Sequence, residues 1–297
     1  MTWYAIIGAL EQGLVYGIMV LGVYLTFRVL DFPDLTVDGS LPLGAAVSAV
    51  AITKGVDPFA SILLAACAGF AAGMVTALLN TKLKILHLLA SILTMIALYS
   101  INIRIMDGPN VSLLGASTVL DPFMAAGTAG YVVAPVMYGL LAVLITGGIV
   151  WFLHTELGQA MLATGDNPQM IRSLGVNTHH IIIIGVGLSN ALVAVSGALV
   201  AQNQGASDVN MGIGTIIAGL ASVILGETVF GSTGVTRTCI AVLLGSVLYR
   251  LAIAMALGLK LGNFAVTPSD LNLITALLVV LALMAPGIKR KFGGRAK

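Results

Sequence analysis

The chain has 297 residues, of which 58% are hydrophobic and only 9% are charged, whereas a soluble domain carries about 25% charged residues. A soluble protein of this length could not bury so much apolar surface, and the few charged residues could not cover it. The net charge of +2 comes from scattered basic residues with no single basic face, which excludes a nucleic-acid-binding protein. We therefore expect a protein that lies in a lipid bilayer.

Long apolar runs follow one another along the chain. A membrane-spanning helix needs about 20 mostly apolar residues, and no basic residue precedes the first run, which makes that run a span rather than a cleavable signal peptide. The candidate spans are 4–27, 39–53, 59–80, 86–106, 131–153, 178–201, 212–230, 238–258 and 271–287. The sequence therefore predicts an all-α polytopic membrane protein with about nine spans, within a range of eight to ten. Residues 1–297 form a single transmembrane domain in this interpretation.

The second candidate span differs from the others. It is short, and Gly39, Pro42 and Gly44 interrupt it. This pattern predicts a broken or re-entrant helix, which is tolerated only where protein or a cavity surrounds it. Two glycine pairs in other spans, Gly13-x-x-x-Gly17 and Gly69-x-x-x-Gly73, predict faces where helices pack closely.

The distribution of basic residues predicts the orientation, because cytoplasmic loops carry an excess of Lys and Arg. We expect the C-terminus to be cytoplasmic and the N-terminus to lie outside. Basic residues placed inside are Arg28, Lys82, Lys84, Arg172, Arg237, Lys289, Arg290, Lys291, Arg295 and Lys297; those placed outside are Lys54, Arg104 and Lys260.

Motifs of known enzyme chemistry are absent from the sequence. The dipeptide Gly-Lys does not occur, so the chain has no P-loop for ATP. The patterns H-E-x-x-H, C-x-x-C and G-x-S-x-G are also missing. We expect a protein that is not itself an enzyme and that holds no cofactor or metal.

A short helix is predicted in the cytoplasmic loop 154–178. Asn167 can cap the first N–H groups and Pro168 suits the first helical position, so we expect a helix over 169–174 that Gly175 ends. Three glycines are expected to act as breakers or hinges around it: Gly158, Gly165 and Gly175. Composition alone favours an ordinary loop helix.

The same loop resembles the coupling segment of ABC importer permeases of the branched-chain amino-acid and ribose-type family. In that family the segment reads roughly G-x-A-x-x-A-x-G-x-N-x-x-x-A-x-x-x-G-I-N. The residues that fall on this pattern in register are Gly158, Ala160, Ala163, Gly165, Asn167, Gly175 and Asn177. Ser173 or a nearby residue replaces the pattern's small alanine, and Val176 replaces its isoleucine. The resemblance implies that this segment, including Arg172, couples to an ATPase.

Three further segments carry the resemblance, so that it covers most of 30–235. Residues 34–40, DLTVDGS, resemble the family's D-L-S-V-G-S with an extra Asp38, which weakens any transfer of a sugar-contact role. Residues 80–94 are similar to its N-x-x-L-x-x-x-L…P-F-I-x-T-L-G-T stretch, with His87 about where proline is frequent. Residues 221–231 resemble A-x-V-x-L-G-G…G-G, with Glu227 in place of a common glycine.

The resemblance implies a type II-like importer in the plasma (inner) membrane of a bacterium. Two permease copies would pair in the lipid bilayer, two separate ATPase subunits would dock at the coupling helices, and an extracytoplasmic solute-binding protein, often a lipoprotein, would deliver a small-molecule solute. The departures from the ribose-type pattern favour an amino acid or a similar small solute. Two alternatives stay open: a secondary transporter or channel with no ATPase partner, and a structural membrane scaffold.

Polar residues within the spans are candidates for the solute pathway, because an ionisable group in lipid is costly. An interrupted second span exposes backbone polar groups that can line a cavity, and small residues of the run 212–230 would allow a narrow gate near a dimer axis. The pathway candidates are Asp38, Ser40, Gly219, Ser222 and Glu227. For Glu227 and Arg250, a structural ion pair between adjacent helices and a gating role both stay open.

Overall fold

The computed structural model describes residues 3–124, 130–257, 260–261, 264–265 and 280. By length and composition, six of the described helices can cross a membrane. They are α1 (Trp3–Tyr24) with the π-helical turn η1 (Leu25–Val29), α3 (Pro58–Thr81), α4 (His87–Met106), α6 (Gly130–Leu153), α9 (Thr178–Gln204) and α11 (Val235–Leu257). The prediction of an all-α polytopic membrane protein is thereby confirmed.

The predicted total of nine spans is not confirmed. Two of the predicted spans correspond to helices of 17 and 16 residues, α2 (Val37–Thr53) and α10 (Thr215–Phe230), which are short for a crossing. The predicted span 271–287 lies outside the described residues, apart from Val280. The remaining helices are α5 (Asp121–Met124), α7 (Glu156–Asp166) and α8 (Pro168–Ser173).

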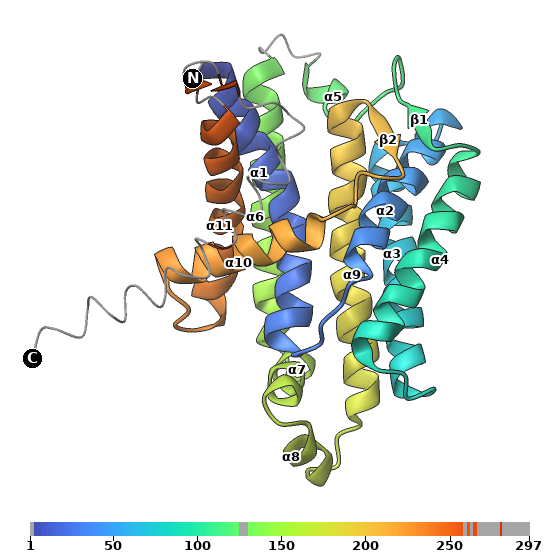
Figure 1. Cartoon of the computed structure of the whole chain (residues 1–297), viewed down its shortest axis with the longest axis vertical. Coiled ribbons are helices and arrows are strands. Elements are labelled where there is room, and N and C mark those ends of the chain that lie inside the picture. Colours follow the sequence, from blue (N-terminus) through green and yellow to red (C-terminus); the bar gives the residue numbers. More distant parts are fainter. Residues whose placement is uncertain (1–2, 125–129, 258–259, 262–263, 266–279, 281–297) are drawn as a thin grey trace, which may run out of the picture.

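Two short strand pairs complete the described structure. The strand β1 (Asn110–Ser112) pairs antiparallel with β2 (Ala206–Asp208), and β3 (Lys260–Leu261) pairs with β4 (Phe264–Ala265). The first pair ties the segment after α4 to the segment after α9 at one end of the molecule (Figure 1). The helices α7 and α8 lie at the opposite end, near the turn between α3 and α4.

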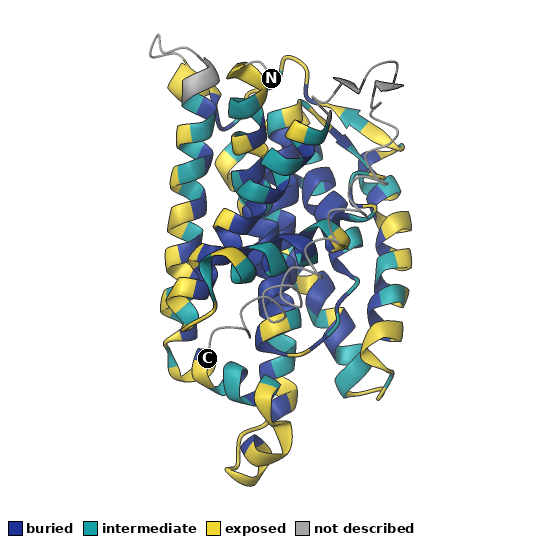
Figure 2. Cartoon of the chain, turned by 60° about the vertical axis from the view of Figure 1, so that its left-hand side comes forward, coloured by how far each residue is buried: buried dark blue, intermediate teal, exposed yellow. Residues whose placement is uncertain are grey.

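The long helices run side by side along the long axis, and α10 lies across them at about half their height (Figure 1). The crossing direction of α10 is seen in a second view as well (Figure 2). The prediction that 212–230 spans the membrane is therefore not confirmed, because α10 lies across the long helices and not along them. An apolar composition shows that a segment is buried, but it does not fix the angle at which the segment packs.

Helix α9 forms the centre of the bundle, and most of its residues are buried (Figure 2). Glycines let its neighbours approach closely: a Cβ on Gly44 of α2 would overlap the Ala194 backbone, and one on Gly197 of α9 would overlap the Leu41 carbonyl oxygen. Gly69 and Gly73 lie against the α9 backbone in the same way. The predicted packing role of that glycine pair is confirmed.

Serine hydroxyls add hydrogen bonds between α9 and α1, as expected for helices that pack in lipid. Ser189 donates to the Gly22 carbonyl oxygen at 2.7 Å, and Ser196 donates to the Val15 carbonyl oxygen at 2.8 Å. These contacts hold α1 beside the central helix, where it also packs on α11 through Gly13 and Gly17.

The interruption predicted inside the second span lies before it instead. Residues 30–36 rise from the lower end of η1 to the middle of the bundle, where α2 begins (Figure 1). Pro42 is accommodated within a continuous helix. It has no N–H for the Asp38 carbonyl oxygen, and Gly212 lies against that oxygen so closely that an added Cβ would overlap it. Helix α2 is therefore a short helix of 17 residues that starts in the middle of the bundle.

Candidate functional site

Residues 154–178, which we call the coupling segment after the resemblance of their sequence, fold as two helices joined at Asn167. The Asn167 side chain accepts hydrogen bonds from the backbone N–H groups of Gln169 and Met170 at 3.1 and 3.0 Å. Pro168 occupies the first position of α8. Gly175 has a φ of 88°, which favours glycine, and it follows the end of α8. The predicted helix start and stop are confirmed, with α8 one residue earlier than expected.

The interpretation of Gly158 and Gly165 as hinges is wrong. Both lie inside α7, and both mark close approaches: a Cβ on Gly158 would overlap the Phe152 carbonyl oxygen, and one on Gly165 would overlap the Val29 carbonyl oxygen. Ala160 and Ala163 are half-buried on the same helix. The glycines and alanines that carry the family pattern in α7 therefore pack this helix onto the membrane domain.

The outer surface of the coupling segment is made mostly by other residues, and only Val176 among them stands at a position that the motif defines. Large apolar side chains are exposed there, with 70% of Leu174 and 46% of Met170 accessible. Leu157 and Val176 are exposed as well. Arg172 is also exposed, and its Nε donates to Thr178 Oγ1 at 2.7 Å. Apolar residues in an otherwise polar loop were the signal that could have found this surface in the sequence.

Asp38 joins the two short helices α2 and α10 in the middle of the bundle. Its carboxylate accepts hydrogen bonds from the Gly214 N–H at 3.1 Å, the Ile216 N–H at 2.9 Å and the Thr215 hydroxyl at 3.0 Å. These donors belong to the first turn of α10, whose unpaired N–H groups and positive dipole end favour an anion. Asp38 therefore caps α10 from the first turn of α2.

Ser40 lies deeper and belongs to a buried network. Its hydroxyl donates to Asn190 Oδ1 at 2.7 Å, and Asn190 Nδ2 donates to Asp34 Oδ2 at 2.7 Å. Asp34 Oδ1 accepts the Thr36 N–H at 2.9 Å, and the side chains of Asp34, Ser40 and Asn190 are fully buried. The network fixes the linker before α2 onto α9, and this burial gives no support to a pathway role for Ser40.

A cavity of about 400 Å³ lies beside Asp38, and we call it the central cavity. Residues of α2, of α4 and of the segment before α10 line it: Asp38, Gly39, Pro42, Met95, Ile96, Tyr99, Ser100, Asn102, Val209 and Ile213. Asn102 Nδ2 donates to the Gly39 carbonyl oxygen at 3.2 Å, whereas Asn102 Oδ1 has no partner among the described residues. The cavity thus combines an apolar wall with a carboxylate and an amide.

The small-residue face of α10 is not free to line a pathway in this structure. Gly219 lies against Val23 of α1, and Ser222 is buried with its hydroxyl bonded to the Ala218 carbonyl oxygen at 2.8 Å. Ser222 belongs to the stretch of α10 that packs on Gly245 of α11. The expectation that this face gates a pathway stays untested, and in the described conformation the face is occupied.

Glu227 and Arg250, for which the sequence leaves both an ion pair and a gating role open, have separate partners. Glu227 Oε1 accepts a hydrogen bond from Arg28 Nε at 2.9 Å, which is an ion pair between α10 and η1. The guanidinium of Arg250 lies 3.7 Å from the centroid of the Tyr16 ring, a cation–π contact between α11 and α1. Both contacts tie α1 to its neighbours. Among the described residues, no group of His, Cys, Asp or Glu side chains is placed to hold a metal ion.

A family described as "Branched-chain amino acid transport system / permease component" matches residues 5–285 of the chain. The chain belongs to this permease family. The match covers the membrane helices, the coupling segment and the junction at Asp38 together, so the family resemblance of the sequence is confirmed.

Relatives of the permease include proteins with several transport roles. It is 41% identical to the tyrosine transport system permease protein of Clostridioides difficile (strain R20291), over 95% of this chain and 91% of the relative. It is 26% identical to the ribose import permease protein of Escherichia coli (strain K12), over 63% of this chain and 58% of the relative. An autoinducer 2 import permease of Yersinia pseudotuberculosis is 28% identical over 55% of this chain and 45% of its own length. No solved structure shows a significant match.

Proposed function

We propose that this permease is the membrane subunit of an ATP-driven importer that takes an amino acid or a similar small solute into the cell. Two copies pair in the membrane, two ATPase subunits bind at α7 and α8, and a solute-binding protein delivers the solute from outside. The family match supports the permease role, and the tyrosine transport relative supports an amino acid as solute.

The exposed apolar surface of the coupling segment carries this proposal. Leu157 and Met170 lie on α7 and α8, and Leu174 and Val176 lie in the turn between α8 and α9. These elements extend beyond the long helices at one end of the molecule (Figure 1). Clusters of exposed apolar side chains on a soluble surface mark contact with another protein. Since the inner face of α7 packs tightly on Val29 and Leu153, a force applied to the outer face reaches η1 and α6 directly.

Co-purification with the ATPase subunit tests this surface. We expect Leu174→Asp to weaken the complex strongly, because a charged side chain in an apolar contact is costly. Leu114→Asp is the matched control, since Leu114 is 93% exposed in the segment at the opposite end of the molecule. Equal recovery of the ATPase with both variants would contradict a docking role for α8.

We further propose that the solute passes the central cavity beside Asp38. Helices that start within the membrane often frame solute sites in transporters, and α2 and α10 both start beside this cavity. The carboxylate and amide suit the amino group of an amino acid, while Met95, Ile96 and Tyr99 suit an apolar or aromatic side chain.

Filling the cavity tests this pathway. Ser100 lines the central cavity, and Ser100→Trp should abolish solute uptake while the ATPase still binds. Leu89→Trp is the control on the same helix, because Leu89 is exposed and lines none of the cavities described here. Wild-type uptake by the Ser100→Trp protein would place the pathway elsewhere.

A further inference from the structure

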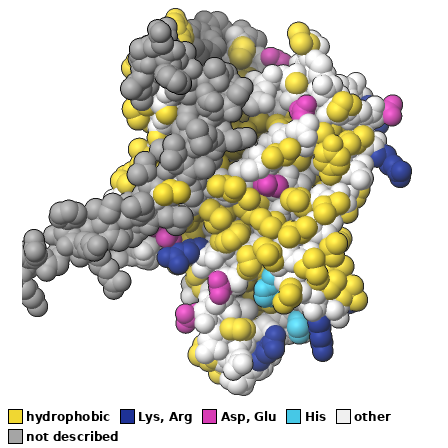
Figure 3. All heavy atoms as spheres, in the orientation of Figure 1, with side chains coloured by type: hydrophobic (Ala, Val, Ile, Leu, Met, Phe, Trp, Pro, Cys, Tyr) yellow, Lys and Arg dark blue, Asp and Glu magenta, His cyan; other side chains and the backbone are white. Residues whose placement is uncertain are grey.

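A second polar cavity lies at the end of the molecule that carries the coupling segment. It has a volume of about 550 Å³ and lies between the linker after η1, the turn between α3 and α4, and the segment from α7 to α9. Its titratable lining residues are Asp31, Lys84, His87, Arg172 and His179. We call it the basic cavity. Histidine and basic side chains gather at this end of the face shown in Figure 3.

The cations of the basic cavity are not neutralised by neighbouring carboxylates. Among the described residues, Arg28 and Glu227 form the only ion pair, so Lys84 and Arg172 have none. The Asp31 carboxylate lines the same cavity, but it lies beyond salt-bridge distance from both Lys84 and Arg172. The Arg172 guanidinium is held through its Nε by Thr178, and the His87 ring stacks on Phe32 with centroids 4.5 Å apart. The cavity therefore holds two cationic side chains, Lys84 and Arg172, and one carboxylate.

The backbone at this cavity indicates that Lys84 is there for a reason other than the turn, whereas aspartate is common at positive φ. Asp31 and Lys84 have φ values of 50° and 55°, and only one other non-glycine residue of the described chain has a positive φ. Lysine in this left-handed region is unfavourable by about 1 kcal/mol, and glycine or asparagine would serve the turn better. Strained residues of this kind concentrate at functional sites.

Helix ends of both polarities border the cavity. Helix α4 begins at His87, where no side chain caps its first turn, and α9 begins close by with Asn177 as its cap. Helices α3 and α7 end beside the same cavity, with Thr81 and Gly165 among its lining residues. The N-terminal ends carry a partial positive charge and the C-terminal ends a partial negative one, so the preference for an anion rests on the cationic side chains.

We propose that the basic cavity binds a phosphate group. Lys84 and Arg172 suit phosphate because an ammonium and a planar guanidinium both donate charge-assisted hydrogen bonds to its oxygens. The phosphate can belong to a soluble phosphorylated anion or to the headgroup of an anionic lipid. Since Gly165 and Arg172 of the coupling segment and Lys84 of the α3–α4 turn all line the cavity, a group bound to both cations would link the two segments.

Binding to the purified chain in nanodiscs tests the proposal. Inorganic phosphate is titrated by calorimetry into nanodiscs of phosphatidylcholine, at constant ionic strength in chloride, and phosphatidylglycerol binding is followed by native mass spectrometry. Saturable binding of phosphate supports a soluble anion. Retention of phosphatidylglycerol over phosphatidylcholine, without phosphate binding, supports the lipid headgroup.

The chain offers a matched pair of lysines. Lys84 lines the basic cavity, whereas Lys82 is an exposed lysine of the same turn that does not. We expect Lys84→Gln to weaken binding about tenfold, as for the loss of one charge-assisted hydrogen bond, and Lys82→Gln to change it less than twofold. Lys84→Arg should keep most of the binding because it keeps the charge.

Removal of the single carboxylate of the basic cavity should have the opposite effect on phosphate binding. Asp31→Asn should tighten binding about threefold, because it removes a negative charge at the cavity, and asparagine tolerates the positive φ. Equal loss with Lys82→Gln and Lys84→Gln, or no effect of Asp31→Asn, would show diffuse surface attraction and overturn the proposal. Absence of phosphate and phosphatidylglycerol binding, with Lys84 protected from amine modification by the ATPase subunit, would instead assign the cavity to a protein contact and overturn it too.

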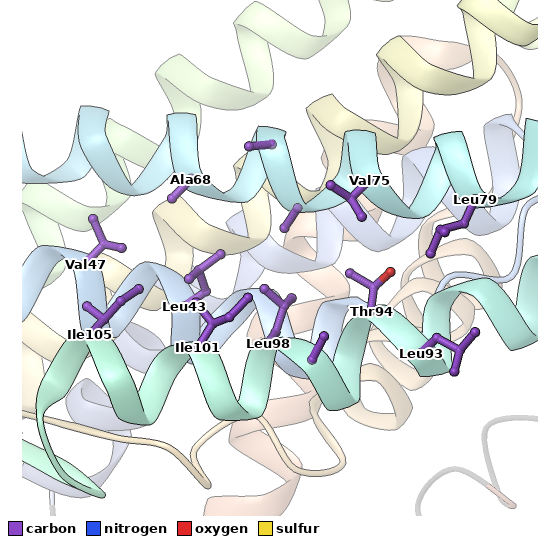
Figure 4. Close-up of a pocket in the computed structure, with 13 residues that line it drawn as sticks. Leu43, Val47, Ala68, Val75, Leu79, Leu93, Thr94, Leu98, Ile101 and Ile105 are labelled. Carbon is purple, nitrogen blue, oxygen red and sulfur yellow. The ribbon is translucent and has the colours of Figure 1, made fainter. Parts of the chain in front are cut away.

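Three remaining features carry no second proposal. The apolar groove lined by α2, α3 and α4 residues, such as Leu43, Val75 and Ile101, holds no fixed charge among its lining residues (Figure 4). A cavity at the opposite end is lined by Asp57 and mostly uncharged loop residues. Cys67 and Cys239 are single thiols.

Discussion

Asp38 accepts three hydrogen bonds from the first turn of α10, although 176 residues separate it from Gly214. The extra aspartate was visible in the sequence as an acidic residue at the start of an interrupted span. Its partner was not, because the N-terminus of α10 reaches it only through tertiary packing. The same limit applies to Asn190, which joins Ser40 to Asp34 across 150 and 156 positions.

Replacement of Asp38 should therefore destabilise the fold. We expect Asp38→Ala to lower the free energy of unfolding by about 1–3 kcal/mol, because it leaves the Gly214 and Ile216 N–H groups without an acceptor, whereas the Thr215 hydroxyl can still donate to the Gly212 carbonyl oxygen. Asp38→Asn should cost less, since its amide oxygen can still accept. Thermal unfolding in detergent measures both changes against Asp166→Ala, whose carboxylate is exposed. No larger loss for Asp38→Ala than for this control would show that the cap is unimportant.

At Gly165 the structure and the hinge interpretation predict different results. Alanine favours a helix over glycine by about 1 kcal/mol. If Gly165 were only a hinge, Gly165→Ala would stiffen the helix and cause no steric overlap. In the structure a Cβ at Gly165 overlaps the Val29 carbonyl oxygen, and Gly165→Ala should push α7 away from η1. We expect uptake per ATP hydrolysed to fall in the reconstituted importer, with Gly147→Ala in α6 as control, because no atom lies within 4 Å of a Cβ added there. Unchanged coupling in Gly165→Ala would show that this contact is not part of the transmission.

Among the elements, α8 was predictable and α10 was not. Asn167, Pro168 and Gly175 are local signals that act within one helix, so the sequence contains everything needed to place α8. The run 212–230 has the composition of a span, but its direction is set by α1 and α11, which meet it at Gly219 and Gly226. Hydrophobic pattern alone cannot distinguish a helix that crosses the bilayer from one that crosses the bundle.

The close contact between α2 and α9 should be sensitive to size. Gly197→Val places side-chain atoms where the Leu41 carbonyl oxygen lies, and we expect a loss of about 1–3 kcal/mol or more, as for overpacked cores. Gly147→Val is the control, because Gly147 is exposed in α6 with no atom within 4 Å of an added Cβ. The apparent melting temperatures of the two proteins in the same detergent give the comparison. Equal melting temperatures would contradict the close approach.

The whole molecule has two ends of different character. The turn between α3 and α4 and the coupling segment lie at one end, and the segments with Lys54 and residues 107–124 lie at the other (Figure 1). This separation agrees with the sides that the basic residues predict, with Arg172, Lys82 and Lys84 in the cytoplasm. The basic tail 289–297 lies outside the described residues.

Labelling of single cysteines in intact cells tests this orientation. In a background without Cys67 and Cys239, a membrane-impermeant thiol reagent should modify Ser117→Cys and leave Gln169→Cys unmodified. Both positions are exposed, so accessibility on the folded chain is matched. Modification of Gln169→Cys from outside would reverse the orientation.

Reconstitution in proteoliposomes tests the central claim most directly. The permease is combined with its ATPase subunit and its solute-binding protein, and uptake of radiolabelled amino acid is measured with each component omitted in turn. We predict that uptake requires all three components and ATP, and that the purified permease alone hydrolyses no ATP. Uptake by the permease alone, driven by a solute or ion gradient, would contradict this account and identify a secondary transporter.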